Sequence, residues 1–270
     1  MVEYKKYSGA GNDFLMVNNL KNELADLSSL TKELVAKEEK KFDGVIYLED
    51  SDIADFRMNY YNRDGTGNAL CGNGLRCTAR YIKDNSFSDK DVLKLEAVGK
   101  IFQAEFLSDG DISVSFPSPK EMRFGFPLKV NFSEWWQDII VSYVDLGSKH
   151  CVIFTDDIKG AVPMLENIDI NEWGRNIRMH TDFMPEGVNA NFAEIRGEEI
   201  YLRSFEKGVE GETLACGTGA LSTGLAAYAL KNIEPPFRIK VRSGATLRVN
   251  FKIYNSRIMN LTLTGPASEL

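Results

Sequence analysis

The order of apolar and polar residues predicts many strands and few helices. Alternating or aromatic-rich stretches typical of strands occur at residues 55–62, 111–119, 198–206 and 238–251, the last broken by a Ser-Gly turn. Leu and Val residues at helical spacing, with charges between them, predict a surface helix at 21–41.

Two further helical patterns each begin at a cysteine. Residues 69–77 read ALCGNGLRC and residues 214–222 read LACGTGALS. In both, a cysteine (Cys71 or Cys216) precedes a Gly-polar-Gly turn and then a run suited to a helix. The second run is rich in Ala and other small residues, which predicts a helix buried on all sides. The two cysteines are about half the chain length apart, so the pattern predicts two related halves.

The prolines near the middle of the chain indicate where the halves divide. Pro117 and Pro119, followed by the RFGFP segment, punctuate the sequence there. We expect an N-terminal domain at 1–118 and a C-terminal domain at 119–259. A tail at about 260–270 is expected to return to the first domain.

Composition and charge exclude several classes of protein. The 270 residues carry a net charge of −7, which argues against a nucleic-acid partner because phosphate binding needs clustered Lys and Arg. No stretch approaches the roughly 20 apolar residues of a membrane span, and the N-terminus lacks the apolar region of a secretory signal. We therefore expect a cytoplasmic protein with no membrane partner.

The cysteine pattern favours free thiols over disulfides or a metal site. The four cysteines contain no C-x-x-C pair, and only two histidines could supply imidazole to zinc. No metal is predicted. A lone cysteine beside glycine is usually a small buried apolar residue, which is our interpretation of Cys77 and Cys151.

The repeated cysteine turn suggests a chemistry for Cys71 and Cys216. The positive end of a helix stabilises thiolate over thiol, and successive N–H groups at the glycine turn can bind a carboxylate. Inverting a stereocentre next to a carboxylate needs a base on one face and an acid on the other. Cysteine can serve as either. Two copies of the turn therefore indicate a two-base proton transfer at an α-carbon.

At this point the chain resembles a known family. YSGAGNDF, YYNRDGTGNALCGNGLRC, EGVNANF and FEKGVEGETLACGTGA are similar, in this order, to the signatures of diaminopimelate epimerase. The resemblance implies an α+β fold of two pseudo-symmetric domains, each a mostly antiparallel β-sheet or barrel wrapped around a central helix, with the active site between them. It also implies interconversion of LL- and meso-diaminopimelate, without a cofactor, in lysine and peptidoglycan-precursor biosynthesis.

The resemblance also implies roles for individual residues. Cys71 and Cys216 would be the acid/base pair, with His150 and Glu206 tuning the two thiols. The substrate-binding positions would be Asn12, Asn62, Gly72, Asn73, Ser148, Asn189, Glu206, Lys207, Gly217 and Thr218.

Some positions depart from the usual family pattern. Lys207 replaces an arginine that clasps a substrate carboxylate, and lysine lacks the planar two-pronged geometry. Ser148 stands where asparagine often binds the ligand, and KKFDGV (40–45) replaces a glycine-rich segment. The sequence LTGPASEL ends early for this family, at the place where a homodimer contact is usually made.

These departures keep two other functions open. One is a cofactor-independent epimerase or racemase of another amino acid. The other, from a different class, is a non-catalytic amino-acid-binding protein or a thiol redox protein. Loss of activity in Cys71→Ala and Cys216→Ala variants separates the epimerase from the redox protein, which would show thiol–disulfide turnover.

Overall fold

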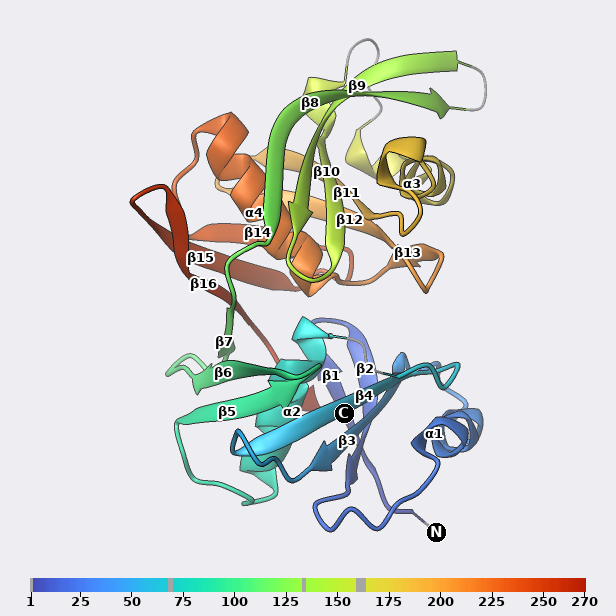
Figure 1. Cartoon of the computed structure of the whole chain (residues 1–270), viewed down its shortest axis with the longest axis vertical. Coiled ribbons are helices and arrows are strands. Elements are labelled where there is room, and N and C mark those ends of the chain that lie inside the picture. The colour runs from blue at the N-terminus through green and yellow to red at the C-terminus, as the bar shows by residue number, and fades with distance from the viewer. Residues whose placement is uncertain (1, 68–69, 133–134, 159–163) are drawn as a thin grey trace. The chain divides into compact units, whose positions relative to one another are not determined.

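A computed structural model describes residues 2–67, 70–132, 135–158 and 164–270 of the chain. The fold divides into two compact units. Unit 1 comprises Met1–Phe116 and Thr264–Leu270, and unit 2 comprises Pro117–Leu263. Each unit combines one long central helix with many strands (Figure 1).

Unit 1 contains two helices and most of its strands before residue 117. Its elements are β1 (Lys5–Gly9), β2 (Asn12–Asn18), α1 (Leu27–Ala36), β3 (Gly44–Glu49), β4 (Phe56–Asn62), α2 (Gly72–Asp84), β5 (Val92–Ala97), β6 (Lys100–Phe106), β7 (Ile112–Phe116) and β17 (Ser268–Glu269).

Unit 2 contains two α-helices, three short 3₁₀ turns and the remaining strands. Its elements are β8 (Glu121–Phe132), β9 (Trp135–Asp145), β10 (Lys149–Phe154), η1 (Thr155–Asp157), η2 (Leu165–Asn167), α3 (Ile170–Arg178), η3 (Thr181–Phe183), β11 (Asn189–Arg196), β12 (Glu199–Glu206), β13 (Gly211–Thr213), α4 (Gly217–Lys231), β14 (Phe237–Val241), β15 (Thr246–Tyr254) and most of β16 (Arg257–Gly265).

The two units repeat one order of strand pairing. In unit 1, β1 pairs antiparallel with β2, β2 parallel with β3, β3 antiparallel with β4, β4 parallel with β5, and β5 antiparallel with β6. In unit 2, the same sequence of orientations runs through β9, β10, β11, β12, β14 and β15. The helices α2 and α4 follow β4 and β12 respectively, so they occupy equivalent places.

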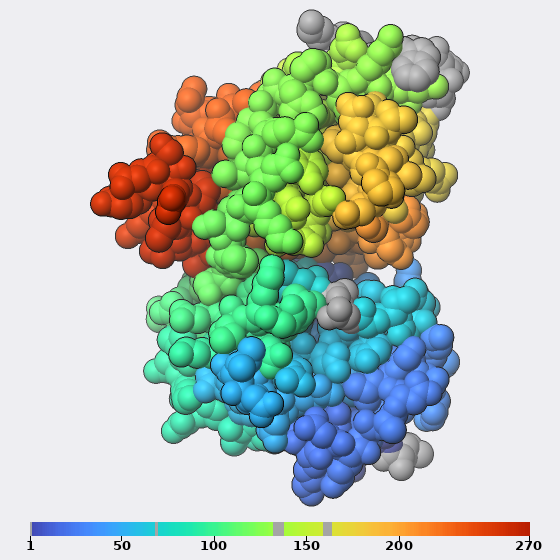
Figure 2. All heavy atoms as spheres, in the orientation of Figure 1, coloured from blue at the N-terminus to red at the C-terminus, as the bar shows by residue number. Residues whose placement is uncertain are grey.

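The strands of each unit surround its long helix. The described strands β1 to β7 all contact α2, and β8 to β11, β14 and β15 contact α4 (Figure 1). The first eleven residues of α4 are buried, as its small side chains predicted. Burial on all sides explains why α4 lacks the polar face of a surface helix, whereas α2 keeps Arg80, Lys83 and Asp84 on its less buried side. By contrast, the atoms of α3 lie at the surface of unit 2 in the space-filling view (Figure 2).

The end of the described chain belongs to unit 1. Strand β17 pairs antiparallel with β1, and the backbone N–H of Leu270 donates to the Lys6 carbonyl oxygen at 2.8 Å. Thr264 also donates from Oγ1 to the Ser113 hydroxyl at 2.9 Å. These contacts fix the last residues against strands made from the first part of the sequence.

The predicted strands are confirmed, and the helix at 21–41 is shorter than predicted. It runs only from Leu27 to Ala36, because Asp26 adopts a left-handed conformation (φ 45°) and caps the helix by accepting from the Ser29 N–H at 3.2 Å. Asn22 also has a positive φ, of 53°, which is incompatible with a helix at that point. None of the helices that the structure describes is long and apolar enough to cross a membrane.

Candidate active site

Cys71 and Cys216 cap their helices with the same geometry. Cys71 (φ −128°, ψ 109°) precedes α2, and its Sγ accepts from the Gly74 N–H at 3.3 Å. Cys216 (φ −117°, ψ 109°) precedes α4, and its Sγ accepts from the Gly219 N–H at 3.4 Å. Sulfur thus occupies the capping position that Ser, Thr or Asp oxygens usually fill.

This capping has a chemical consequence for the first turn of each helix. The first four backbone N–H groups of an α-helix have no carbonyl partner within the helix. The sulfur accepts one of them, that of the third helical residue, Gly74 or Gly219. The two preceding N–H groups are those of Gly72 and Asn73 in α2, and of Gly217 and Thr218 in α4. They are the positions for which carboxylate binding was predicted.

Four other predicted site positions lie at the ends of strands. Asn62 is the last residue of β4 and Glu206 is the last residue of the equivalent strand β12. Asn189 begins β11 and Asn12 begins β2. Two of the four reach the cysteine turn of their own unit, because Asn12 accepts from Asn73 and Glu206 interacts with Cys216. Their roles stay predictions.

In unit 1, a chain of hydrogen bonds joins Asn12 and Asn73. Asn73 donates from Nδ2 to Asn12 Oδ1, and Asn12 donates from Nδ2 to Asp43 Oδ2 at 3.2 Å. Asn73 in turn accepts from the guanidinium of Arg76 at 2.6 Å. Burial raises the pKa of the Asp43 carboxyl. The sequence suggested neither Asp43 nor Arg76 as part of the site.

Asn62 belongs to a turn as well as to the motif. Its backbone N–H donates to the Thr66 carbonyl at 2.8 Å and its Nδ2 donates to the Thr66 hydroxyl at 3.0 Å. These bonds hold the turn at residues 62–66, which is a structural role that asparagine often takes.

In unit 2, Asn189 connects two other predicted site positions, Ser148 and Lys207. Its Nδ2 donates to the Ser148 hydroxyl and to the Lys149 carbonyl, both at 3.0 Å. Its Oδ1 accepts from the backbone N–H of Lys207 at 2.8 Å. The buried amide therefore joins β10, β11 and the turn after β12 into one polar cluster.

His150 lies at the centre of this cluster and is fully buried. Burial lowers its pKa to about 3, so the ring is neutral at ordinary pH. Asn191 donates from Nδ2 to the histidine Nδ1 at 3.1 Å, which leaves the proton on Nε2. That nitrogen lies 2.9 Å from the Thr218 hydroxyl and 3.1 Å from that of Ser148.

The histidine reaches Cys216 through Thr218. Because His150 Nε2 carries a proton, it can donate to Thr218 Oγ1, whose own hydroxyl proton then points on toward Cys216 Sγ at 3.8 Å. Asn191 is held against the same turn, since a Cβ on Gly219 would meet Asn191 Oδ1 at 2.3 Å. Only glycine fits at that position. Asn191 was missed, although it stands beside Asn189 in the quoted EGVNANF signature.

For Cys216, burial outweighs the effect that a helix start has on a thiol. Burial raises the pKa of this thiol well above its ordinary value, and the charge and hydrogen bonding of Glu206 raise it further. The Gly219 N–H and the Thr218 hydroxyl act in the opposite direction but are outweighed. The helix terminus is present, yet burial of the thiol, together with the partly buried carboxylate of Glu206 beside it, makes the thiol the favoured form.

Glu206 is itself held by a short hydrogen bond. Its Oε1 accepts from the Thr213 hydroxyl at 2.5 Å. Thr213 ends β13, the strand that leads into Cys216, and β13 pairs with β12 through Glu206 and Gly211. Thr213 was not predicted, although a hydroxyl three residues before a candidate catalytic cysteine is a signal that could have been used.

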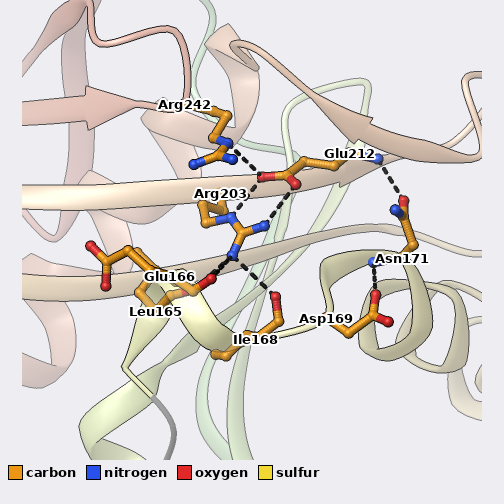
Figure 3. A network of polar contacts seen from close by, with 8 residues as sticks. All are labelled: Leu165, Glu166, Ile168, Asp169, Asn171, Arg203, Glu212 and Arg242. Atoms are coloured by element: carbon orange, nitrogen blue, oxygen red, sulfur yellow. Dashed lines mark hydrogen bonds and ion pairs between the residues drawn. The ribbon is translucent and has the colours of Figure 1, made fainter.

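A polar network anchors β13 from its other side (Figure 3). Arg203 donates to both carboxylate oxygens of Glu212 at 2.7 Å, and the same guanidinium donates to the carbonyls of Leu165, Glu166 and Ile168. The Glu212 backbone N–H donates to Asn171 Oδ1 at 3.0 Å. We call Arg203 and Glu212 the β13 clamp, because they fix the strand that carries Thr213.

No cluster of three or more metal-ligating side chains occurs within the described ranges. All four cysteines are free thiols, of which Cys77 and Cys151 are fully buried. The pKa of both buried thiols is raised by burial, which matches their interpretation as apolar core residues.

Solved structures share this fold at low sequence identity. A Bacillus anthracis phenazine biosynthesis protein of the PhzF family aligns with a TM-score of 0.74 at 13% identity, covering 100% of this chain and 97% of that one. A probable proline racemase from Agrobacterium radiobacter aligns with a TM-score of 0.72 at 14% identity, covering 100% and 91%. These similarities confirm the predicted α+β fold class.

Sequence comparison identifies the family. The family model described as diaminopimelate epimerase matches residues 4–119 and 142–269. A diaminopimelate epimerase of Chlorobaculum tepidum is 34% identical over 268 residues, covering 96% of each chain. That of Aquifex aeolicus is 30% identical over 281 residues, covering 98% of this chain and 94% of the relative. The resemblance drawn from the cysteine motifs is confirmed: the chain belongs to the diaminopimelate epimerase family, a family of isomerases.

Proposed function

We propose that this chain interconverts LL- and meso-diaminopimelate in the cytoplasm by a two-base proton transfer, with Cys71 and Cys216 as the bases. The proposal extends to a place in the supply of lysine and peptidoglycan precursors. The observation that carries it is the repeated cap: two cysteines, at equivalent places in two units of the same strand pairing, each accept from the third N–H of a helix.

The reaction proceeds in two proton transfers. One cysteine, as thiolate, takes the proton from the α-carbon, and the electron pair of the C–H bond moves onto the carboxylate. The other cysteine, as thiol, gives its proton to the opposite face of the carbon. Backbone N–H groups at Gly72 and Asn73, and at Gly217 and Thr218, would stabilise the charge that develops on the carboxylate oxygens.

The other predicted residues divide between thiol tuning and substrate binding. Glu206 lies beside Cys216 and can accept its proton, so it would act on this thiol directly. His150 would act through Thr218 in the resting form. Asn12, Asn62, Ser148, Asn189 and Lys207 would contact the amino and carboxylate groups of the amino acid.

Incubation with LL-diaminopimelate in deuterated water tests the proposal. We expect meso product that carries deuterium at one α-carbon, with no cofactor added. Cys71→Ala and Cys216→Ala should each reduce turnover by at least about 1,000-fold, because alanine supplies no acid or base. Cys151→Ala is the matched control, a cysteine buried outside the proposed chemistry, and should keep most of the activity.

Other outcomes would assign a different function. Deuterium exchange into another amino acid, without turnover of diaminopimelate, would indicate a related epimerase or racemase, consistent with Lys207 in place of arginine. Retained activity in either cysteine variant would contradict the two-base mechanism. Thiol–disulfide turnover without any α-proton exchange would indicate a redox protein instead.

A further inference from the structure

Arg76 is a buried cation that the proposed mechanism does not use. It lies in α2, five residues after Cys71, and its side chain is fully buried with 0% exposure. Among the described residues it forms no ion pair within 4 Å, and its Nη1 atom has no hydrogen-bond partner. An ionised side chain placed in a protein interior is strongly destabilising unless its surroundings compensate. The position therefore requires an explanation.

Arg76 is joined by hydrogen bonds to two predicted substrate ligands, directly to Asn73 and through it to Asn12. Its Nη2 donates to Asn73 Oδ1 at 2.6 Å, and its Nε donates to the Pro266 carbonyl at 3.4 Å. A guanidinium has donors only, so Asn73 must present its oxygen to it. The amide nitrogen of Asn73 then points to Asn12, which donates in turn to Asp43.

This chain has a fixed direction because its two ends have opposite character. Arg76 supplies only donors at one end, and the Asp43 carboxylate supplies acceptors at the other, where it also accepts from the Asp13 N–H at 2.9 Å. Neither Asn73 nor Asn12 can rotate its amide by a half turn without placing like groups together. The guanidinium thus determines which side of each amide donates.

The charge of Arg76 also acts on the thiols near it. Its pKa is lowered by burial, and the negative forms of Cys77, Cys71 and Asp111 act in the opposite direction. Arginine nonetheless stays protonated in proteins. Cys77 is fully buried, and burial raises its pKa, so it remains a thiol. Cys71 is partly exposed and caps the helix, so it is the thiol that can respond to the guanidinium.

We propose that Arg76 is a positioning residue of the Cys71 half-site: it fixes the amides of Asn73 and Asn12 in one orientation and places a positive charge that favours the Cys71 thiolate. The inference rests on the proposed function of Cys71 as a base. Its two parts are separable, because lysine can keep the charge of arginine but not its planar, multiply donating geometry.

The test measures thiol ionisation in the full chain without substrate. Wild type, Arg76→Met and Arg76→Lys are alkylated with iodoacetamide between about pH 5 and about pH 10, a range that brackets the usual thiol pKa. Peptide mass spectrometry follows Cys71, with Cys216 in the same molecule as internal reference. Arg80→Met is the matched control, because Arg80 lies one turn further along α2 and donates to the Gly110 carbonyl instead.

We expect Arg76→Met to move the alkylation midpoint of Cys71 up by about one pH unit or more, because a charge that favours thiolate is lost. Arg80→Met should leave the midpoint in place. Arg76→Lys should retain the midpoint of Cys71 but raise the KM for diaminopimelate about tenfold, since the amides lose their fixed orientation.

Two results would overturn the inference. A folded Arg76→Met variant with the wild-type midpoint, by circular dichroism and alkylation, would show that the charge does not act on Cys71. Wild-type KM in Arg76→Lys would show that Arg76 does not orient the amides, and this variant decides if Arg76→Met does not fold. Because alkylation needs no turnover, a wild type inactive on diaminopimelate would refute the proposed function while leaving the shift measurable.

Discussion

The two cysteine caps share a backbone but differ in the charge beside them. Cys71 has the buried guanidinium of Arg76 on its own helix, whereas Cys216 has the carboxylate of Glu206 at the end of β12. The repeat has thus preserved the helix-capping geometry while the neighbouring charges have opposite signs. A positive neighbour favours thiolate and a negative neighbour favours thiol.

This difference suits a reaction that needs one base and one acid at the same time. If both cysteines had the same surroundings, both would tend to carry the same protonation state, and one of them would be in the wrong form. In the proposed mechanism, opposite neighbours would prepare Cys71 to remove a proton and Cys216 to donate one. The comparison teaches that the repeated fold gives two sulfurs the same capping geometry, while unlike side chains around them would assign their starting roles.

The largest expected effect on the difference between the two cysteines comes from removing the carboxylate of Glu206. Glu206→Gln keeps the shape of the side chain but loses its charge, and we expect kcat to fall by about 100-fold or more. The alkylation midpoint of Cys216 should move down, because Glu206 raises the pKa of this thiol. The midpoint of Cys71 in the same sample is the control. An upward shift at Cys216 would contradict the assignment.

A smaller effect is expected when Glu206 is kept but loses its hydrogen bond from Thr213. Thr213→Val has nearly the shape of threonine but cannot donate to Glu206 Oε1, and we expect kcat to fall by about tenfold because the carboxylate is no longer held. Thr213→Ser should restore most of the activity. Equal losses in the valine and serine variants would mean that the methyl group, not the hydroxyl, matters.

Removing the β13 clamp should affect stability more than chemistry. The side chains of Arg203 and Glu212 are 11% and 18% exposed. Arg203→Met leaves the mostly buried carboxylate with only the Arg242 guanidinium, at 3.6 Å, and removes the Arg203 donor from three carbonyls. We expect the free energy of unfolding in urea to fall by about 3 kcal/mol. Arg238→Met, which breaks an exposed ion pair with Glu199, is the control and should change it by less than about 1 kcal/mol.

The smallest expected effect concerns the neutral histidine. The pKa of His150 is about 3 in the folded chain, whereas an unfolded histidine titrates near 6.5. Between these values the unfolded state binds more protons, so His150 reduces stability as the pH falls from about 6.5. In His150→Gln the free energy of unfolding should therefore fall less steeply from about pH 7 to about pH 5. His180→Gln is the control, and a pH dependence equal to wild type in His150→Gln would contradict the assignment.

Much of the fold followed from local patterns in the sequence. The alternation in the strands, and the small residues after Cys216, depend on neighbours a few positions away, so they predicted β12 and α4 correctly. The helix at 21–41 was predicted too long because helical spacing of Leu and Val continues through Asp26, whose backbone conformation ends it. Such a cap depends on one residue and does not alter the periodicity.

The candidate site could be predicted from the sequence at positions that belong to a motif, but not at positions that depend on packing. Cys71 and Cys216 became candidates because they recur in matching turns. Arg76 and Asn191 were missed because their importance arises from burial and from partners distant in the sequence. A charged residue between the apolar residues Leu75 and Cys77 was the available signal for Arg76. Glu206, the charged residue beside Cys216, was suggested by the family motif, whereas Thr213, which donates a hydrogen bond to it, was not.

The return of the last residues to unit 1 has a consequence for how the chain folds during synthesis. Unit 2 is one continuous stretch, but unit 1 needs β17 and the Pro266 carbonyl that accepts from Arg76. Domains generally fold as units, the earliest one first, as the ribosome releases them. Here the part that emerges first is finished last: its buried arginine gains an acceptor only when residue 266 has been added, after all of unit 2 has been translated.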